Sequence, residues 1–417
     1  VTVEVGPHSA RTRANAEGRW RVTLPPLGSG KGPLTMTVKA GQETIQLTDI
    51  LVGEVWLCSG QSNMEMAVSS SEFKAAKHPN IRIFSVPRDI AIDPQDDIVG
   101  QWQACSPETI GGFSAVAYYF GREIHQSIEV PVGLINSSWG GSIIEAWTRH
   151  EEISRLPDML ERIAEIQDIL HDPASSRTSH AHPTLLYNAM INPIVPFAIR
   201  GATWYQGESN NGDGMLYFDK MQALIQSWRN VFLRPDAPFY FVQIAPYRYV
   251  APYGDGQGTL PLLWEAQSAA LAIPHTGMAV ISDIGNVANI HPSNKLDVGK
   301  RLALWALAKD YGQDDLVYSG PLYNSMAIEA GKIRLSFDHT GSGLASRDAK
   351  PLDWFEIAGE DGKFVKAQAV IDGNTIVVSS DAIAKPTAAR FAWDQVAQPN
   401  LINKEGLPAG PFRTHRP

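Results

Sequence analysis

Ser62 follows an apolar segment, GEVWLC, and stands in the polar segment SGQSN, where a helix-favouring stretch begins. A serine between a parallel strand and a helix lies where backbone N–H groups converge, and such donors can stabilise an oxyanion. Gly60 permits a tight backbone turn just before it. Met64 stands where the G-x-S-x-G elbow of the α/β-hydrolases has its last glycine, so that motif is absent. Taken alone, Ser62 can equally be a helix N-cap.

His291 is the base that the sequence offers, because a serine hydroxyl is a weak nucleophile until a base removes its proton. The chain contains 11 histidines, and most of them, such as His8 and His78, lie in polar segments. His291 instead follows an apolar strand and a loop, and it precedes a long amphipathic segment. We therefore expect Ser62 and His291 at the same carboxyl edge of a sheet. A capping or buried structural histidine is the alternative.

The elements that must position these residues form an α/β domain over residues 51–316. Apolar strands alternate there with amphipathic helices, a pattern that is typical of a parallel sheet. Strands are expected at 54–58, 132–136, 201–205, 239–245 and 277–282, and helices at 114–126, 154–171, 217–232, 262–272 and 293–311. A polar loop after residue 171 is expected to border the active site.

Both flanks of this domain are predicted to be β structure. Residues 1–50 contain short alternating runs, including RWRVTL at 19–24, separated by turn residues, and predict hairpins of a small sandwich. Residues 317–417 lose the helical period, and their DG and GN turns indicate a C-terminal β-sandwich.

Composition excludes several classes of function. The 417 residues carry a formal charge of −9, which argues against nucleic acid or an anionic membrane as the partner. The sequence contains no apolar run of roughly 18 residues, so no transmembrane helix is expected. Cys58 and Cys105 are expected to be buried free thiols, with one disulfide as the alternative. No ligand cluster predicts a metal, and no cofactor is expected. The chain begins at Val1 in a strand-like segment, which indicates a processed or trimmed chain.

Four segments resemble, in order, the motif blocks of the sialate O-acetylesterase family, a branch of the SGNH hydrolases. They are GEVWLCSGQSNMEM, NSSWGGSIIEAW, GATWYQGESN and DIGNVANIHPSNKLDVGKRLALWAL. The resemblance implies an SGNH-hydrolase-like three-layer α/β domain that removes O-acetyl groups from a carbohydrate through an acetyl-serine intermediate. It assigns Ser62 as nucleophile and His291 as base. It also implies a secreted or periplasmic location in a bacterium.

The third member of a catalytic triad is left open. The family often has aspartate two residues before this histidine, where the chain has Asn289, and the wider SGNH spacing falls on Ala288. The imidazole can be held by a backbone carbonyl near Ala288, by the Asn289 side chain, or by Asp283 or Glu208 from elsewhere. We favour a neutral acceptor, because the loop already places such groups beside His291.

The resemblance also points to the rest of the site. The oxyanion donors are expected from the Ser62 N–H, the Gly140–Gly141 pair and the side chain of Gln206, with Asn210 as the alternative. Flat aromatic rings suit sugar faces, although they are as readily core residues. Arg149 can meet an anionic sugar or simply lie at the surface. The expected substrate contacts are Gln61, Asn63, Trp139, Trp147 and Trp204.

The sequence leaves the substrate and the competing functions open. O-acetylated sialic acid and acetylated plant polysaccharide, of the xylan or xyloglucan type, are both expected partners. A short-chain lipase or thioesterase is the second enzymatic hypothesis. A non-catalytic carbohydrate-binding protein is the third, and the missing aspartate is its only support. The oligomeric state is not predicted.

Overall fold

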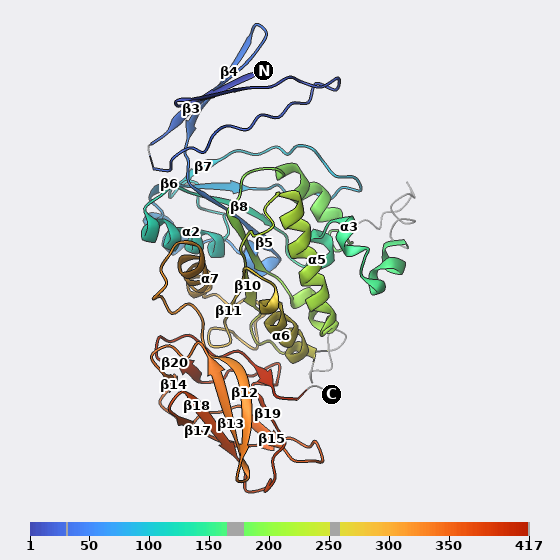
Figure 1. Cartoon of the computed structure of the whole chain (residues 1–417), viewed down its shortest axis with the longest axis vertical. Helices are drawn as coiled ribbons and strands as arrows, with labels where there is room; N and C mark the ends of the chain where they lie inside the picture. The colour runs from blue at the N-terminus through green and yellow to red at the C-terminus, as the bar shows by residue number, and fades with distance from the viewer. Residues whose placement is uncertain (31, 165–178, 251–258, 416–417) are drawn as a thin grey trace.

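The computed structural model describes the chain except residues 31, 165–178, 251–258 and 416–417 (Figure 1). A seven-stranded sheet lies at its centre, in the order β11-β10-β9-β5-β8-β6-β7. All neighbours are parallel except β7, which runs antiparallel to β6. The strands are β5 (Glu54–Gly60), β6 (His78–Ser85), β7 (Gln103–Cys105), β8 (Val132–Ser138), β9 (Gly201–Tyr205), β10 (Phe239–Gln243) and β11 (Thr276–Val280).

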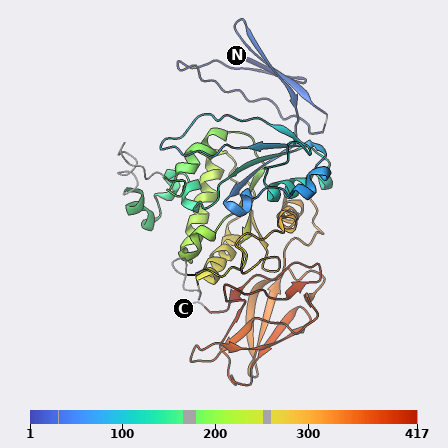
Figure 2. The same cartoon turned by 180° about the vertical axis from the view of Figure 1, so that it is seen from behind.

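Helices cover both faces of this sheet (Figures 1 and 2). α2 (Ala115–Ile128) and α7 (Lys295–Asp310) pack on one face, where the Trp56 ring meets Phe120 edge-on at 5.0 Å. α5 (Leu216–Val231) and α6 (Thr259–Ala269) cover the other, where Trp204 meets Trp228 at 5.7 Å. Because successive strand residues point to opposite faces, a parallel sheet buried on both sides needs apolar residues throughout. The three-layer α/β fold expected from the sequence is thus confirmed.

The N-terminal region forms one antiparallel sheet in the order β2-β1-β3-β4. The expectation of a strand at 19–24 is wrong, because this stretch pairs with no neighbour and is mostly exposed. Pro25 and Pro26 follow it directly, and proline lacks the N–H that a ladder requires. The strands present are β1 (Thr2–Val5), β2 (His8–Arg11), β3 (Leu34–Ala40) and β4 (Glu43–Ile50).

The C-terminal region is the expected β-sandwich. Two four-stranded sheets, β12-β13-β18-β17 and β16-β15-β19-β21, enclose one apolar core, and β14 pairs with β20. The alternating burial of β13 and β18 shows which face points inward. The strands are β12 (Leu322–Glu329), β13 (Lys332–Asp338), β14 (Leu344–Ser346), β15 (Phe355–Ala358), β16 (Val365–Lys366), β17 (Gln368–Asp372), β18 (Thr375–Ser379), β19 (Ala388–Phe391), β20 (Leu401–Asn403) and β21 (Phe412–Arg413).

Most expected elements of the α/β domain are present, and the differences have local causes. β6 and β7 were not expected, since β6 begins with HPN and lacks a clear apolar run. The helix expected at 154–171 is interrupted: α3 (His150–Ile153) ends early, and a 3₁₀ turn begins at Pro157, whose nitrogen cannot donate. Residues 165–171 of that helix lie outside the described residues.

Cys58 and Cys105 are both buried free thiols, as expected. In the part of the chain that is described, no helix is both long and apolar enough to cross a membrane.

Candidate active site

The carboxyl ends of three strands bring the predicted site residues to one edge of the sheet. In the parallel register, Gly60 of β5 lies opposite Ser138 of β8 and Tyr205 of β9. The segments that follow these strands carry Ser62, the Gly140–Gly141 pair and the 206–210 loop. Gly60 has φ +143°, and a Cβ there would lie 2.1 Å from the Tyr205 carbonyl oxygen, so only glycine fits.

Ser62 and His291 meet in the structure. Ser62 opens the short helix α1 (Ser62–Glu65), and its Oγ lies 2.8 Å from Nε2 of His291. Both side chains are partly exposed, so a substrate can reach them. Burial lowers the pKa of His291, and the positive charge of Lys295 lowers it further. The neutral imidazole, the form that can accept a proton from Ser62, is therefore favoured.

None of the three residues predicted as a third triad member holds the His291 ring. The Asn289 Oδ1 accepts a hydrogen bond of 2.9 Å from the main-chain N–H of His291, and this closes an Asx turn. Both oxygens of Asp283 bind Arg301, at 2.6 and 2.7 Å. Glu208 binds Asn63 instead. Among the residues that the structure describes, none accepts a hydrogen bond from Nδ1 of His291.

Gln61 and Asn63, which the sequence predicted to contact substrate, are both buried. The Gln61 Oε1 accepts hydrogen bonds from the backbone N–H groups of Gly207 and Ser209 and so ties the loop after β9 to β5. The Asn63 amide donates to Glu208 Oε1 and accepts from Lys295 Nζ, both at 2.6 Å. Both polar atoms of Asn63 are thus used inside the protein. Gln61 Nε2 has no hydrogen-bond partner among the described residues, so a substrate contact of Gln61 stays a prediction.

The glycine pair lies against the nucleophile. A Cβ at Gly140 would be 3.1 Å from Glu65 Oε2 and 3.2 Å from the Ser62 Cβ. The Gly140 N–H donates to Glu65 Oε2 at 2.9 Å, so it is already engaged. Within the described part of the chain, the N–H groups of Ser62 and Gly141 have no acceptor. These two are the backbone donors that can serve a developing oxyanion.

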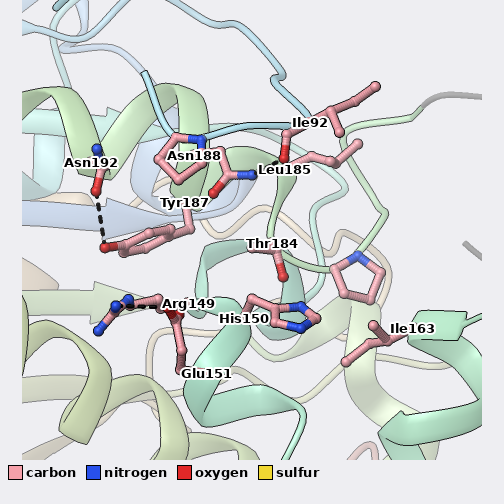
Figure 3. A pocket seen from close by; sticks show the side chains of 12 residues that line it. Ile92, Arg149, His150, Glu151, Ile163, Thr184, Leu185, Tyr187, Asn188 and Asn192 are labelled. Atoms are coloured by element: carbon pink, nitrogen blue, oxygen red, sulfur yellow. Dashed lines mark hydrogen bonds and ion pairs between the residues drawn. The ribbon is translucent and has the colours of Figure 1, made fainter. Parts of the chain in front are cut away.

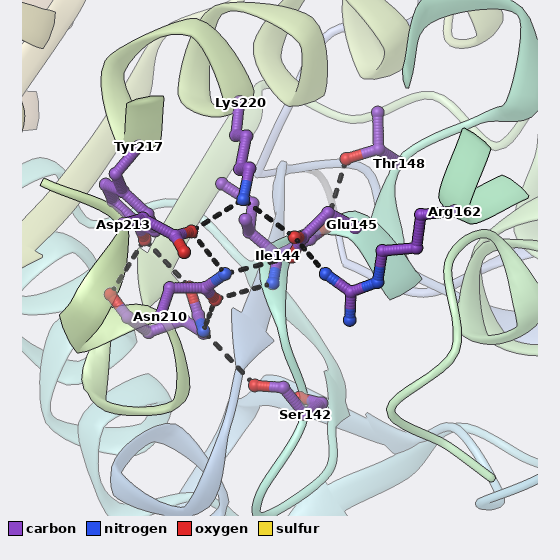
Figure 4. Close-up of polar contacts among 10 residues, drawn as sticks. Ser142, Ile144, Glu145, Thr148, Arg162, Asn210, Asp213, Tyr217 and Lys220 are labelled. Carbon is purple, nitrogen blue, oxygen red and sulfur yellow. Dashed lines mark hydrogen bonds and ion pairs between the residues drawn. The ribbon is translucent and has the colours of Figure 1, made fainter. Parts of the chain in front are cut away.

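The structure corrects the prediction that Gln206 or Asn210 supplies a side-chain oxyanion donor. Gln206 Nε2 donates to the Ser142 carbonyl at 3.1 Å and to Asn210 Oδ1 at 2.6 Å. Asn210 Nδ2 in turn donates to Glu145 and Asp213 (Figure 4). Both amides belong to a buried network and have no hydrogen left for a substrate.

A buried ion pair organises that network. Lys220 Nζ lies 2.8 Å from Glu145 Oε1 and 2.7 Å from Asp213 Oδ2, and the lysine and Glu145 side chains are 3% and 1% exposed (Figure 4). Burial alone raises the pKa of Glu145, but the charge and hydrogen bond of Lys220 outweigh it, so the net pKa is lowered. The pair joins α5 to the segment that carries Gly140 and Gly141.

Of the three tryptophans expected to contact sugar, only Trp139 lies at the surface of the site. Trp147 and Trp204 are buried and pack edge-on against each other at 6.3 Å, so they are core residues. Trp139 stacks on His180 at 4.9 Å with an interplanar angle of 5°, and the guanidinium of Arg88 lies 5.9 Å from its ring centre. His180 Nε2 also meets the Gly140 carbonyl at 3.0 Å, which places this aromatic pair beside Ser62.

Arg149 lies in a different pocket (Figure 3). It donates to Glu151 at 2.7 Å, and the two line a cavity of about 280 Å³ together with His150, Thr184 and Tyr187. Ser62 and His291 are not among the residues that line it.

Sequence reasoning missed several residues of the site. Glu65, three positions after Ser62, holds the Gly140 N–H and pairs with Arg88. Lys295, four positions after His291, contacts Asn63. Glu65 and Lys295 both lie in the motif blocks quoted above. Their closeness in sequence to Ser62 and His291 was the signal that could have pointed to them. His180 was not singled out, but it lies in the polar loop after residue 171 that was expected to border the active site. Within the described residues, no group of three or more histidine, cysteine, aspartate or glutamate side chains is placed to hold a metal.

The fold identifies the class of the protein: an SGNH-hydrolase-like α/β domain with a C-terminal β-sandwich. A carbohydrate acetylesterase from Xanthomonas citri superposes with a TM-score of 0.89 at 39% sequence identity, and the match covers 99% of this chain and 92% of that one.

The family follows from the sequence comparisons. Residues 52–307 match the family model of carbohydrate esterases described as sialic acid-specific acetylesterases. The sialate O-acetylesterases of Pongo abelii and Homo sapiens are each 34% identical to this chain, over 94% of it and 81% of their own length. The chain belongs to this family, and it is a carbohydrate O-acetylesterase. A non-catalytic binding protein is therefore not the function.

Proposed function

We propose that the protein is a serine esterase that removes O-acetyl groups from a sugar through an acetyl-Ser62 intermediate. The observation that carries this proposal is the 2.8 Å contact between Ser62 Oγ and His291 Nε2. His291 takes the Ser62 proton as Oγ attacks the acetyl carbonyl carbon. The oxyanion is stabilised by the N–H groups of Ser62 and Gly141. The protonated His291 then gives its proton to the departing sugar oxygen.

Deacylation repeats these steps with water. His291 removes a proton from a water molecule that attacks the acetyl carbonyl, and the Ser62 oxygen leaves and recovers its proton as acetate is released. Neutral groups around His291 stabilise its imidazolium form less than a neighbouring carboxylate would. An ester has a better leaving group than an amide, so this weaker stabilisation suffices for ester hydrolysis.

We also propose an O-acetylated sialic acid as the substrate, with acetylated xylan or xyloglucan as the alternative. The stacked Trp139–His180 pair offers a flat surface for a sugar face, and Arg88, which lies near the Trp139 ring and pairs with Glu65, carries a positive charge that can attract the carboxylate of a sialic acid. The family description and the curated relatives name sialate, while the Xanthomonas citri relative is described only as a carbohydrate acetylesterase.

The mechanism and the substrate require separate experiments. Ser62→Ala and His291→Ala should each lower kcat/KM on p-nitrophenyl acetate by about a thousandfold or more while the circular dichroism spectrum is kept. A tenth of wild-type activity in either variant would disprove the assignment. Acetate release from O-acetylated sialic acid, acetylated xylan and acetylated xyloglucan, compared at equal ester concentration, identifies the sugar. A faster rate on octanoate than on acetate esters would instead indicate the lipase alternative.

A further inference from the structure

The side chain of Asn63 joins the nucleophile to both ends of the histidine segment. Its Nδ2 donates to the Ile290 carbonyl at 3.0 Å, and its Oδ1 accepts from Lys295 Nζ at 2.6 Å. Ile290 precedes His291, and Lys295 begins α7 four residues later. Asn63 itself directly follows Ser62 in α1. One amide therefore connects the backbone of the nucleophile to the segment that carries the base.

Two buried ionisable side chains, Glu208 and Lys295, fix the orientation of this amide. Glu208 Oε1 accepts from Asn63 Nδ2 at 2.6 Å, and Lys295 donates to the opposite atom, Oδ1. A flipped amide would turn its N–H groups toward an ammonium and its oxygen toward a carboxylate, so only one orientation satisfies all contacts. Asn63, Glu208 and Lys295 are 1%, 8% and 3% exposed. Water therefore competes little for these hydrogen bonds.

Residues other than the predicted triad members must hold His291 in place. Asp283 and Asn289 are engaged away from the ring, and no other described residue accepts from Nδ1. The ring is therefore positioned chiefly through its backbone, and Asn63 holds that backbone.

We propose that Asn63, clamped between Glu208 and Lys295, is a positioning residue that sets the distance between Ser62 and His291 in place of an acidic triad member. The inference rests on the proposed serine mechanism. It assigns no contact with substrate to these three side chains. Their effect is on geometry: a displacement of about 1 Å between reacting groups can lower the rate about a hundredfold.

The first test is Asn63→Asp, which keeps the size of the side chain but replaces both donated hydrogens with an acceptor. The new oxygen faces Glu208 and the Ile290 carbonyl, so the histidine segment loses its tether. We expect kcat on p-nitrophenyl acetate to fall about 10- to 100-fold with KM changed less than about threefold. Inactivation of Ser62 by a p-nitrophenyl phosphonate should slow in parallel.

The matched control is Asn403→Asp in the sandwich. Asn403 is also fully buried, and its amide donates to the Ser319 and His339 carbonyls and accepts from the Leu407 N–H. This variant should lose thermal stability without losing kcat in the folded fraction. Equal losses of kcat per folded molecule in the two variants would overturn the proposal.

Lys295 supplies a second test that does not require Asn63→Asp to fold. Lys295→Met removes the donor to Asn63 and should lower kcat, while Lys295→Arg keeps a charged donor and should restore most of it. Removal of the cation should raise the pKa of His291 in the methionine variant, because burial and Lys295 both lower it in the native protein. An unchanged kcat in Asn63→Asp or in Lys295→Met, with Ser62→Ala inactive, would refute the positioning role and leave the serine mechanism intact. An active Ser62→Ala would refute the mechanism itself.

Discussion

Gly140→Ala is the substitution for which the structure makes the sharpest prediction. The new methyl group would lie 3.2 Å from the Ser62 Cβ and 3.1 Å from Glu65 Oε2, where ordinary contacts begin near 3.4 Å. Glu65 cannot withdraw freely, because it accepts from the Gly140 N–H and pairs with Arg88. Ser62 or the turn that contains Gly140 must therefore shift by a few tenths of an ångström.

The magnitude follows from what that shift disturbs. A displacement of about 1 Å between the reacting groups lowers the rate about a hundredfold. The smaller shift of Ser62 or Gly140 should therefore lower the rate by at least about tenfold. If the neighbouring Gly141 N–H also leaves the oxyanion position, the loss approaches a hundredfold, since one such donor is worth about 10² or more. We therefore expect kcat to fall about 10- to 100-fold, or about 1.4 to 2.7 kcal/mol in the barrier. KM should change little.

Gly140 does not have a positive φ, so alanine is compatible with its backbone and the variant should fold. Gly212→Ala is the matched control, because a Cβ at that exposed glycine meets nothing within 4 Å. Steady-state kinetics on p-nitrophenyl acetate and thermal melts of both variants make the comparison. A kcat for Gly140→Ala within twofold of the Gly212→Ala value would refute the steric argument.

Three further predictions concern the base, its loop and the buried ion pair. The pKa of His291 is lowered, and the reaction needs the neutral imidazole. Activity should therefore persist as pH falls below 6.5 and be lost only when pH passes the lowered pKa. A kcat/KM profile with an acid midpoint above pH 7 would contradict this. Asn289→Asp should keep the Asx turn, because the side chain is exposed and its Oδ1 only accepts from a backbone N–H. We therefore expect kcat/KM to stay within about threefold of wild type. A large gain in kcat/KM would show that the side chain at position 289 reaches the His291 ring. Lys220→Met should destabilise the protein by about 3–5 kcal/mol in urea unfolding, because it leaves Glu145 charged and buried; a loss below about 1 kcal/mol would show that Arg162 compensates.

The sequence alone was sufficient for the features that local pattern encodes. Apolar runs bounded by turn residues predicted the strands β5, β8, β9, β10 and β11, because a sheet covered on both faces requires continuous apolar residues. The order of these strands and helices then placed Ser62 and His291 at one sheet edge, since parallel strands share their carboxyl end. Their direct contact in the structure agrees with that prediction.

The role of each polar side chain near the site depends on contacts that form only when the chain folds. Asn63, Gln206 and Asn210 have the residue types of substrate or oxyanion contacts, yet their polar atoms are taken by partners that lie from 3 to 232 positions away in the chain. A hydrogen-bond partner depends on distances of a few tenths of an ångström, and sequence spacing does not carry that information. The third triad position shows the same limit: Asp283, Asn289 and Glu208 were all plausible, and the structure gave each of them another partner.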